Sequence, residues 1–261
     1  MSRNFKMVLQ YEGTRYNGWQ KQGNTSDTIQ GKLEQILERM SGEPVEVHGS
    51  GRTDAGVHAA GQTANFRISE EFFRSRGLSG QEEAYLKSYL NRYLPEDIGV
   101  LSVEEVSERF HSRLSAERKT YRYQIETGEK QDVFQRRFRY HLGRKLDTEA
   151  MRLAAERLCG THDFRSFCGN RKMKKSTVRT LYSVDICQEP GSSLVTISFT
   201  GNGFLQNMVR ILTGTLIEIG LGERDWREAD GILNAKDRQA AGFTAPAEGL
   251  CLVRVIYEGL K

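Results

Sequence analysis

Residues 49–58 read Gly-Ser-Gly-Arg-Thr-Asp-Ala-Gly-Val-His, and no other stretch of the chain is as informative. Alternating residues lead into it from Val45 and away from it to Ile68, which is typical of strands. The stretch is therefore predicted to be a sharp loop at the end of a sheet, with Asp54 two residues after Arg52. Its glycines allow unusual backbone conformations and close approach of a ligand. Two interpretations stay open at this point: a hairpin turn whose aspartate caps backbone amides, or a catalytic loop held by a rigid scaffold.

Outward from this loop, the first half of the chain predicts the order strand-helix-strand-strand-helix-strand. The strands are expected at 5–11, 44–49, 60–68 and 98–106, and the helices at 28–40 and 81–93. Asp27 is predicted to cap the first of these helices, with Gln30 at the capping-box position. Pro95 is expected to close the second.

The second half repeats this order. Its strands are expected at 119–126, 178–187, 193–200 and 250–257, and its helices at 147–158 and 203–220, with an additional helix at 225–235. The repeated order is that of the ferredoxin-like and RNA-recognition folds. We therefore predict an α+β protein of two such α/β halves with antiparallel sheets, residues 1–113 and 114–261, joined around a central cleft that is a natural ligand site.

Composition limits the class of protein. At 261 residues and 38% hydrophobic residues, the chain is long enough to bury a sizeable core. No apolar segment reaches the roughly 18 residues of a membrane span, and the N-terminus lacks an apolar signal core, so a cytoplasmic protein is expected. The four cysteines are widely spaced and the five histidines show no ligand spacing, so neither disulfides nor a metal site is predicted.

Positive charge is concentrated in two windows of the chain. Arg109–Lys145 holds eleven Lys or Arg against four Asp or Glu, and Arg165–Arg179 holds six against none, although the whole chain carries only +4. Aromatic residues are interleaved with both windows, and such a pattern indicates a polyanion partner such as RNA. The alternative is an ordinary solvated charged face. Within the second window, the candidates for substrate binding are Arg171, Lys172, Lys174 and Lys175.

Five segments resemble the TruA family of tRNA pseudouridine synthases, which isomerise uridines in the anticodon arm. Gly-Arg-Thr-Asp-Ala-Gly-Val-His-Ala at 51–59 is similar to the catalytic motif of the family. The other four occur in the family's order: Tyr11-Glu-Gly-Thr-Arg-Tyr-Asn-Gly-Trp-Gln20, Arg118-Lys-Thr-Tyr-Arg-Tyr123, Asn207-Met-Val-Arg-Ile-Leu-Thr-Gly214 and Glu248-Gly-Leu-Cys-Leu252. The chain departs from the family at 168–176, so the resemblance assigns no RNA contact there.

The resemblance implies the pseudouridine synthase fold, a homodimer, a tRNA substrate modified at uridines 38–40, and no cofactor. It implies that Asp54 is the catalytic residue, acting either as a nucleophile on C1′ of the ribose or as a base on the C2′ proton. Asp54 must be ionised in either case, and by resemblance Arg210 is its counter-charge. The alternative is that Arg210 extends to water from the helix edge.

Three further residues receive roles from the resemblance. Arg52 is expected to fill the space left by the flipped nucleotide, and its alternative is a phosphate clamp or a structural arginine. Tyr121 is expected to stack on the flipped uracil, and Leu250 to form part of the pocket wall; core packing is the alternative for both. Trp19 and Gln20 either line the pocket or pack beside it, and His58 is expected to bond across the hairpin.

A different class of protein remains possible from the sequence alone. A non-catalytic RNA-binding module of duplicated RNA-recognition type explains the basic windows and the repeated order equally well. Asp54 separates the two hypotheses, because such a module has no need of an acid in an RNA-binding cleft. An oxidoreductase is a poor third, since the glycine-rich loop lacks the dinucleotide-binding spacing and the helix that should follow it.

Overall fold

The computed structural model describes residues 2–170 and 172–257, which form two compact units. The first unit contains the described residues up to Ala116 together with those from Leu252 on, and the second is Glu117–Cys251. Within the described residues, no helix has both the length and the apolar character needed to span a membrane.

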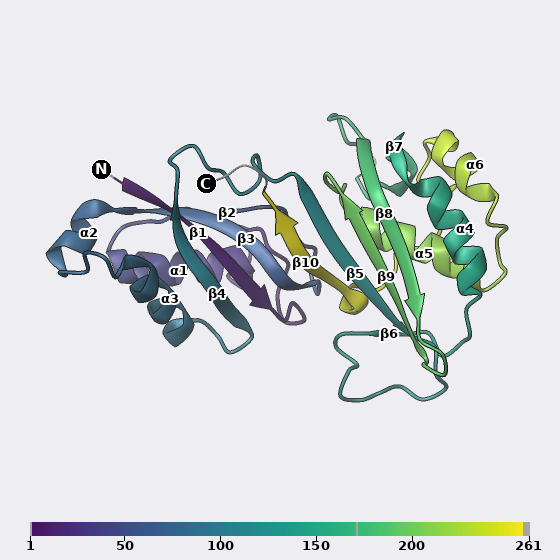
Figure 1. Cartoon of the computed structure of the whole chain (residues 1–261), viewed down its shortest axis with the longest axis horizontal. Coiled ribbons are helices and arrows are strands. Elements are labelled where there is room, and N and C mark those ends of the chain that lie inside the picture. The colour runs from purple at the N-terminus through teal and green to yellow at the C-terminus, as the bar shows by residue number, and fades with distance from the viewer. Residues whose placement is uncertain (1, 171, 258–261) are drawn as a thin grey trace. The chain divides into compact units, whose positions relative to one another are not determined.

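The first unit follows the predicted order, with one added short helix. Its elements are β1 (Ser2–Tyr11), α1 (Ile29–Ser41), β2 (His48–Gly49), β3 (His58–Ser69), α2 (Glu70–Ser75), α3 (Glu82–Tyr93) and β4 (Ile98–Val106). β1 pairs antiparallel with both β3 and β4, and β2 pairs with β3. The part of β10 (Leu250–Ile256) from Leu252 on lies beside β3. Helices α1 and α3 contact each other on one face of this sheet (Figure 1).

Aromatic rings fill the space between that sheet and its helices. The ring of Phe5 on β1 stacks on Phe66 of β3 at 6.0 Å and lies 5.5 Å from Phe73 of α2. Helix α1 buries Leu33 and Leu37 completely, as its apolar periodicity predicts. The loop 50–57 connects β2 to β3 in this unit.

The second unit follows the repeated order with small additions, except that most of the last strand belongs to the first unit. Its elements are β5 (Arg118–Glu126), β6 (Tyr140–His141), α4 (Thr148–Leu158), β7 (Gly160–Asp163), β8 (Val178–Gln188), β9 (Leu194–Gly201), α5 (Met208–Gly220), α6 (Glu228–Ala235) and the first two residues of β10. β5, β9, β8 and β7 pair antiparallel in that order. Helices α4 and α5 pack together on one face of this sheet, and α6 lies against α4 (Figure 1).

Three local predictions are wrong in detail. The strand expected at 44–49 forms only over His48–Gly49. The cap of α1 is Thr28, whose side chain accepts the Gly31 amide, whereas Asp27 forms an ion pair with Lys32. Gln30 makes no capping-box bond and contacts other side chains, as described below.

The helix expected from residue 203 begins at Met208. Asn207, the residue before it, has a left-handed backbone conformation with φ +58°, which breaks the helical path. The preceding residues form a turn in which the Met208 amide bonds the Leu205 carbonyl.

Candidate active site

The loop between β2 and β3 holds Asp54 in a short hydrogen-bonded turn. The Val57 amide donates to the Asp54 carbonyl at 3.1 Å, and Gly56 between them has φ +78°. A left-handed φ favours glycine because other residues meet a Cβ clash there. The Asp54 side chain is half-buried, and Arg52 is exposed. The turn therefore presents a carboxylate and a guanidinium two residues apart, as the motif predicted.

The segment Tyr11–Gln20 holds this loop through backbone contacts at several points. The Trp19 amide donates to the Thr53 carbonyl at 3.0 Å, and the Gly56 amide donates to the Tyr16 carbonyl at 3.3 Å. The Gly13 amide donates to Nδ1 of His58 at 3.0 Å. His58 thus bonds the Tyr11–Gln20 segment of the same unit. Two separated motifs of the sequence therefore form one local structure.

Glycines let the two segments approach within backbone contact. A Cβ on Gly13 would lie 2.0 Å from the Val57 carbonyl oxygen. A Cβ on Gly49 would lie 2.5 Å from the Trp19 indole, which is 2% exposed. The interpretation of Trp19 as a packing residue therefore holds, because its ring lies directly on the backbone that enters the loop.

Hydrogen bonds among buried polar side chains support the backbone of the loop. The Ser50 hydroxyl donates to Oε1 of Gln62 at 2.6 Å, and Nε2 of Gln62 donates to the Gly51 carbonyl at 3.0 Å. The Tyr11 hydroxyl lies 2.8 Å from Oγ1 of Thr53. The four side chains of this network are buried, and a satisfied buried network fixes a backbone more firmly than water-exposed bonds do.

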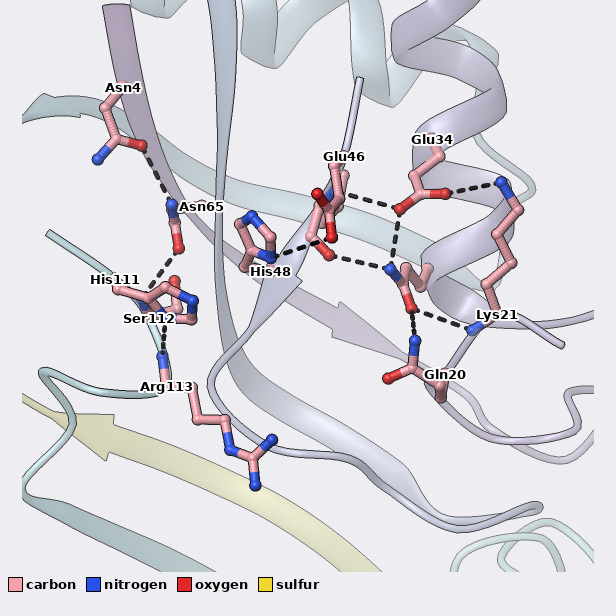
Figure 2. Close-up of polar contacts among 12 residues, drawn as sticks. Asn4, Gln20, Lys21, Glu34, Glu46, His48, Asn65, His111, Ser112 and Arg113 are labelled. Carbon is pink, nitrogen blue, oxygen red and sulfur yellow. Dashed lines mark hydrogen bonds and ion pairs between the residues drawn. The ribbon is translucent and has the colours of Figure 1, made fainter. Parts of the chain in front are cut away.

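A second network reaches Arg52 from helix α1. Nε of Arg52 donates to Oε1 of Gln20 at 2.8 Å, and Nε2 of Gln20 donates to Oε1 of Gln30 at 2.6 Å. Nε2 of Gln30 in turn donates to Oε1 of Glu34 at 2.8 Å. Figure 2 shows Gln20, Lys21 and Glu34 in this network, and the hydrogen bond from Lys21 to Glu34 raises the pKa of the lysine. Three successive hydrogen bonds thus connect Arg52 on the loop to Glu34 on helix α1.

Tyr16 fixes the outer side of the same segment. Its hydroxyl donates to Oδ1 of Asp97 at 2.5 Å, and Arg15 forms an ion pair with the same carboxylate at 2.6 Å. Burial and the hydrogen bond to Asp97 raise the pKa of Tyr16, so the phenol remains a donor at neutral pH. Its role is to hold the Tyr11–Gln20 segment.

In the second unit, Tyr121 and Tyr123 both point into packed surroundings. The ring of Tyr121 meets Phe204 edge to face at 5.1 Å, and 7% of the residue is exposed. Tyr123 is fully buried, and its hydroxyl donates to the Pro246 carbonyl at 2.8 Å. Burial raises the pKa of Tyr123, with a smaller contribution from Glu248. Tyr123 is therefore packed, as expected, and Tyr121 is buried as well.

Arg210 lies in the first turn of α5 and holds the segment before β10. Its Nε donates to the Ala245 carbonyl at 2.7 Å, and its Nη1 donates to Oδ1 of Asn207 at 3.0 Å. Leu250, which follows this segment, is 4% exposed. The second and third motifs thus both contact the segment 245–246, just before the C-terminal block. The sequence order alone did not predict these contacts.

The basic segment is exposed where the structure describes it. Lys172, Lys174 and Lys175 are all exposed, and the Lys172 amide donates to Oδ1 of Asn170 at 3.0 Å. Arg171 lies outside the described residues. The exposure agrees equally with RNA binding and with a solvated charged face, so the role of this segment stays a prediction.

Sequence reasoning missed Gln30 and Glu34 as residues of the site. They are buried although polar, at 7% and 8% exposure, and lie one helical turn apart beside the apolar face of α1. Two polar residues at i and i+4 next to an apolar stripe are a readable signal of a buried hydrogen-bond pair. The signal was overlooked because Gln30 also fits a capping box.

Comparison with known proteins identifies the family. A family model described as tRNA pseudouridine synthase matches residues 7–114 and 154–258. The tRNA pseudouridine synthase A 2 of Bacillus cereus (strain ZK / E33L) is 44% identical over 254 residues, covering 97% of this chain and 99% of that protein. The tRNA pseudouridine synthase A of Bacillus sp. (strain KSM-64) is 46% identical with the same coverage. The tRNA pseudouridine synthase A 1 of Clostridium tetani (strain Massachusetts / E88) is 44% identical over 98% of this chain and 100% of its own length.

The fold and these matches define an RNA-modifying enzyme of the isomerase class. More particularly, the chain belongs to the TruA family of tRNA pseudouridine synthases. The family match decides between the two classes that the sequence left open, in favour of the enzyme. A solved structure titled as a Cbf5-Nop10-Gar1 complex also matches, at 11% identity and a TM-score of 0.39 over 95% of this chain and 48% of that chain, a likeness too slight to support an argument.

Proposed function

We propose that this enzyme converts uridine to pseudouridine at positions 38, 39 and/or 40 of the tRNA anticodon stem-loop, with Asp54 as the catalytic residue. The observation that carries the proposal is the loop 50–57, where the Tyr11–Gln20 segment and a buried polar network hold the backbone around one half-buried carboxylate. Rigid support of a single acid on a loop is typical of a catalytic group.

The reaction requires little more than that acid. The N1–C1′ glycosidic bond breaks, the uracil rotates, and C5 bonds to C1′ while the proton on C5 moves to N1. Asp54 acts on the ribose either by forming an ester with C1′ or by removing the C2′ proton and returning it after reattachment. Both routes are redox-neutral, so the proposal needs no cofactor.

Residues of the second unit complete the proposal. Arg210 is the counter-charge that keeps Asp54 ionised, and two bonds, to Ala245 and Asn207, support a fixed guanidinium. Tyr121 stacks on the uracil after the base leaves the helix, and Leu250 forms part of the pocket wall. Extruding a stacked base costs a few kcal/mol, which Arg52 offsets by filling the vacated space.

The tRNA partner is supported by the two basic windows as well as by the family. Exposed lysines at 172, 174 and 175 are suited to contact phosphates, which position an RNA without reading its sequence. We also propose that the enzyme works as a homodimer, as the family resemblance implies, and that it acts in the cytoplasm.

The function is tested by mapping the product in tRNA. Unmodified tRNA transcripts that carry a single uridine at 38, 39 or 40 are incubated with the purified enzyme, and pseudouridine is located by chemical probing and mass spectrometry. A transcript with cytidine at all three positions is the matched control. Modification at one or more of the three positions supports the proposal, and modification elsewhere in the tRNA contradicts it.

A further inference from the structure

The hydrogen-bond network beside the catalytic loop has a fixed direction. Nε2 of Gln30 donates both to the Glu34 carboxylate at 2.8 Å and to the Val47 carbonyl at 3.1 Å. Both partners can only accept, so the amide of Gln30 cannot turn around. Its Oε1 must therefore face the opposite side, where it accepts from Gln20 and from the Lys21 backbone amide at 3.0 Å.

The orientation of the Gln30 amide in turn determines the orientations of Gln20 and Arg52. Because Oε1 of Gln30 only accepts, Gln20 must present its NH2 group to it, at 2.6 Å. Gln20 therefore turns its own Oε1 toward Arg52, whose Nε–H always needs an acceptor. One carboxylate on α1 thus determines the orientation of two amides and of a guanidinium on the loop.

We infer that Gln20, Gln30 and Glu34 are positioning residues that hold Arg52 in the orientation required for uridine flipping. The inference rests on the role of Arg52 in the proposed function. Arg52 is exposed and flexible by nature, and its hydrogen bond to Gln20 supplies the constraint that a long side chain lacks. The three positioning residues act through Arg52, to which a chain of hydrogen bonds connects them.

The network has a second connection to the same loop. The Val47 amide donates to Oε1 of Glu34 at 3.2 Å, so the two α1 side chains bind both backbone groups of Val47. Val47 is two residues before Gly49, where the backbone enters the catalytic loop. A variant of Gln30 or Glu34 therefore disturbs both the backbone and Arg52, and the test must separate the two effects.

A double-mutant cycle with Arg52 makes that separation. Gln30→Leu, Arg52→Ala and the double variant are compared by single-turnover rate at saturating tRNA, with tRNA affinity and thermal unfolding measured alongside. Gln30→Leu is expected to lower the rate about tenfold in the wild-type background. This factor is the lower end of the range expected when one hydrogen bond to a charged group is lost. In the Arg52→Ala background it is expected to lower the rate by a clearly smaller factor, because only the effect through the Val47 backbone remains.

Two further variants provide controls. Gln35→Leu makes the same chemical change at an exposed position of α1 and should leave the rate unchanged. Glu34→Gln retains an acceptor oxygen for Gln30 and Val47 and should keep most of the activity, whereas Glu34→Leu should match Gln30→Leu. Equal losses from Gln30→Leu in both backgrounds, or a loss from Glu34→Gln as large as that from Glu34→Leu, would overturn the inference.

A measurement without tRNA separates this inference from the proposed function. The NMR signal of the Arg52 Nε–H, assigned by comparison with Arg52→Lys, is expected to be protected from exchange in the wild type and in Gln35→Leu. It should lose protection in Gln30→Leu. A wild-type enzyme that makes no pseudouridine overturns the proposed function, and an Nε–H signal that Gln30→Leu leaves unchanged overturns the positioning network.

Discussion

Replacing Gly13 by alanine should displace the catalytic loop without touching its chemistry. A Cβ at this position would lie 2.0 Å from the Val57 carbonyl oxygen and 2.6 Å from its carbonyl carbon. Real Cβ atoms essentially never approach closer than 3.0 Å, so one of the two backbones must move by about 1 Å. Gly13 itself is not in a left-handed conformation, so the clash alone opposes the alanine.

The displacement should reach Asp54 through one bond. The Val57 amide bonds the Asp54 carbonyl, and a shift of about 1 Å in a catalytic group costs on the order of 100-fold in rate. We therefore expect Gly13→Ala to lower the single-turnover rate by about 100-fold while tRNA affinity changes little. Overpacking should also lower the free energy of unfolding by about 1–3 kcal/mol.

The matched control is Gly23→Ala, because a Cβ at Gly23 meets nothing within 4 Å. Both variants are assayed with saturating enzyme and radiolabelled tRNA, and their unfolding is followed in urea. If Gly13→Ala reacts as fast as Gly23→Ala, the close approach of the two segments does not position Asp54, and the reasoning is refuted.

Three further changes test other parts of the structure. Burial and the neighbouring His48 hold the pKa of His111 below its ordinary value of 6.5, so as pH falls below 6.5 the unfolded chain binds a proton that the folded chain does not. The free energy of unfolding should therefore decrease as the pH is lowered through that range. His111→Gln should make this decrease smaller, as measured by urea unfolding, and an equal decrease in both proteins contradicts the prediction. Arg210→Leu should abolish product formation and lower the free energy of unfolding by about 1–3 kcal/mol, since the buried Ala245 carbonyl loses its donor; retained turnover would rule out the counter-charge. Replacing four basic residues together by glutamine should weaken tRNA binding; they are Arg171, Lys172, Lys174 and Lys175. The slope of log Kd against log salt concentration should fall by about 0.7–0.9 for each phosphate contact that is lost. An unchanged slope would show that these side chains form a solvated face.

The order of elements was predictable because it depends on local periodicity. The apolar spacing of α1 predicted a helix, and Leu33, Leu37 and Met40 are buried as that spacing requires. The alternating residues of β3 and β9 likewise predicted strands, which form close to the expected positions. Periodicity reports which face of an element is buried, so it identifies long elements well.

The misplaced strand at 44–49 shows where periodicity fails. Val45 and Val47 are buried, as an alternating strand requires. The side chains of Gln30 and Glu34, however, bind the backbone N–H and C=O of Val47, so these groups are not available to a neighbouring strand. A bond between a helix side chain and a distant backbone leaves no local pattern in the sequence.

The loop 50–57 was predictable as a motif, and its support was not. Asp54 and Arg52 were identified from their spacing and from the family resemblance. The contact of Gly13 with Val57 and the network from Glu34 to Arg52 join segments that are far apart in the chain. These contacts depend on how distant segments pack together, which only the structure describes.

The most direct test of the central claim is the activity of Asp54→Asn. Asparagine keeps the shape of the side chain but is neither a nucleophile nor a base at neutral pH, so the isomerisation should stop while tRNA binding and unfolding stay close to wild type. Asp27→Asn, at an exposed aspartate of the same unit, is the control and should remain active.

Pseudouridine is measured after prolonged incubation with excess enzyme, per mole of tRNA. We expect one product per modified position for the wild type and for Asp27→Asn, and none above background for Asp54→Asn at full tRNA occupancy. Turnover by Asp54→Asn within about tenfold of the wild-type rate, a loss far smaller than removal of a catalytic group causes, would contradict the assignment of Asp54 as the catalytic residue.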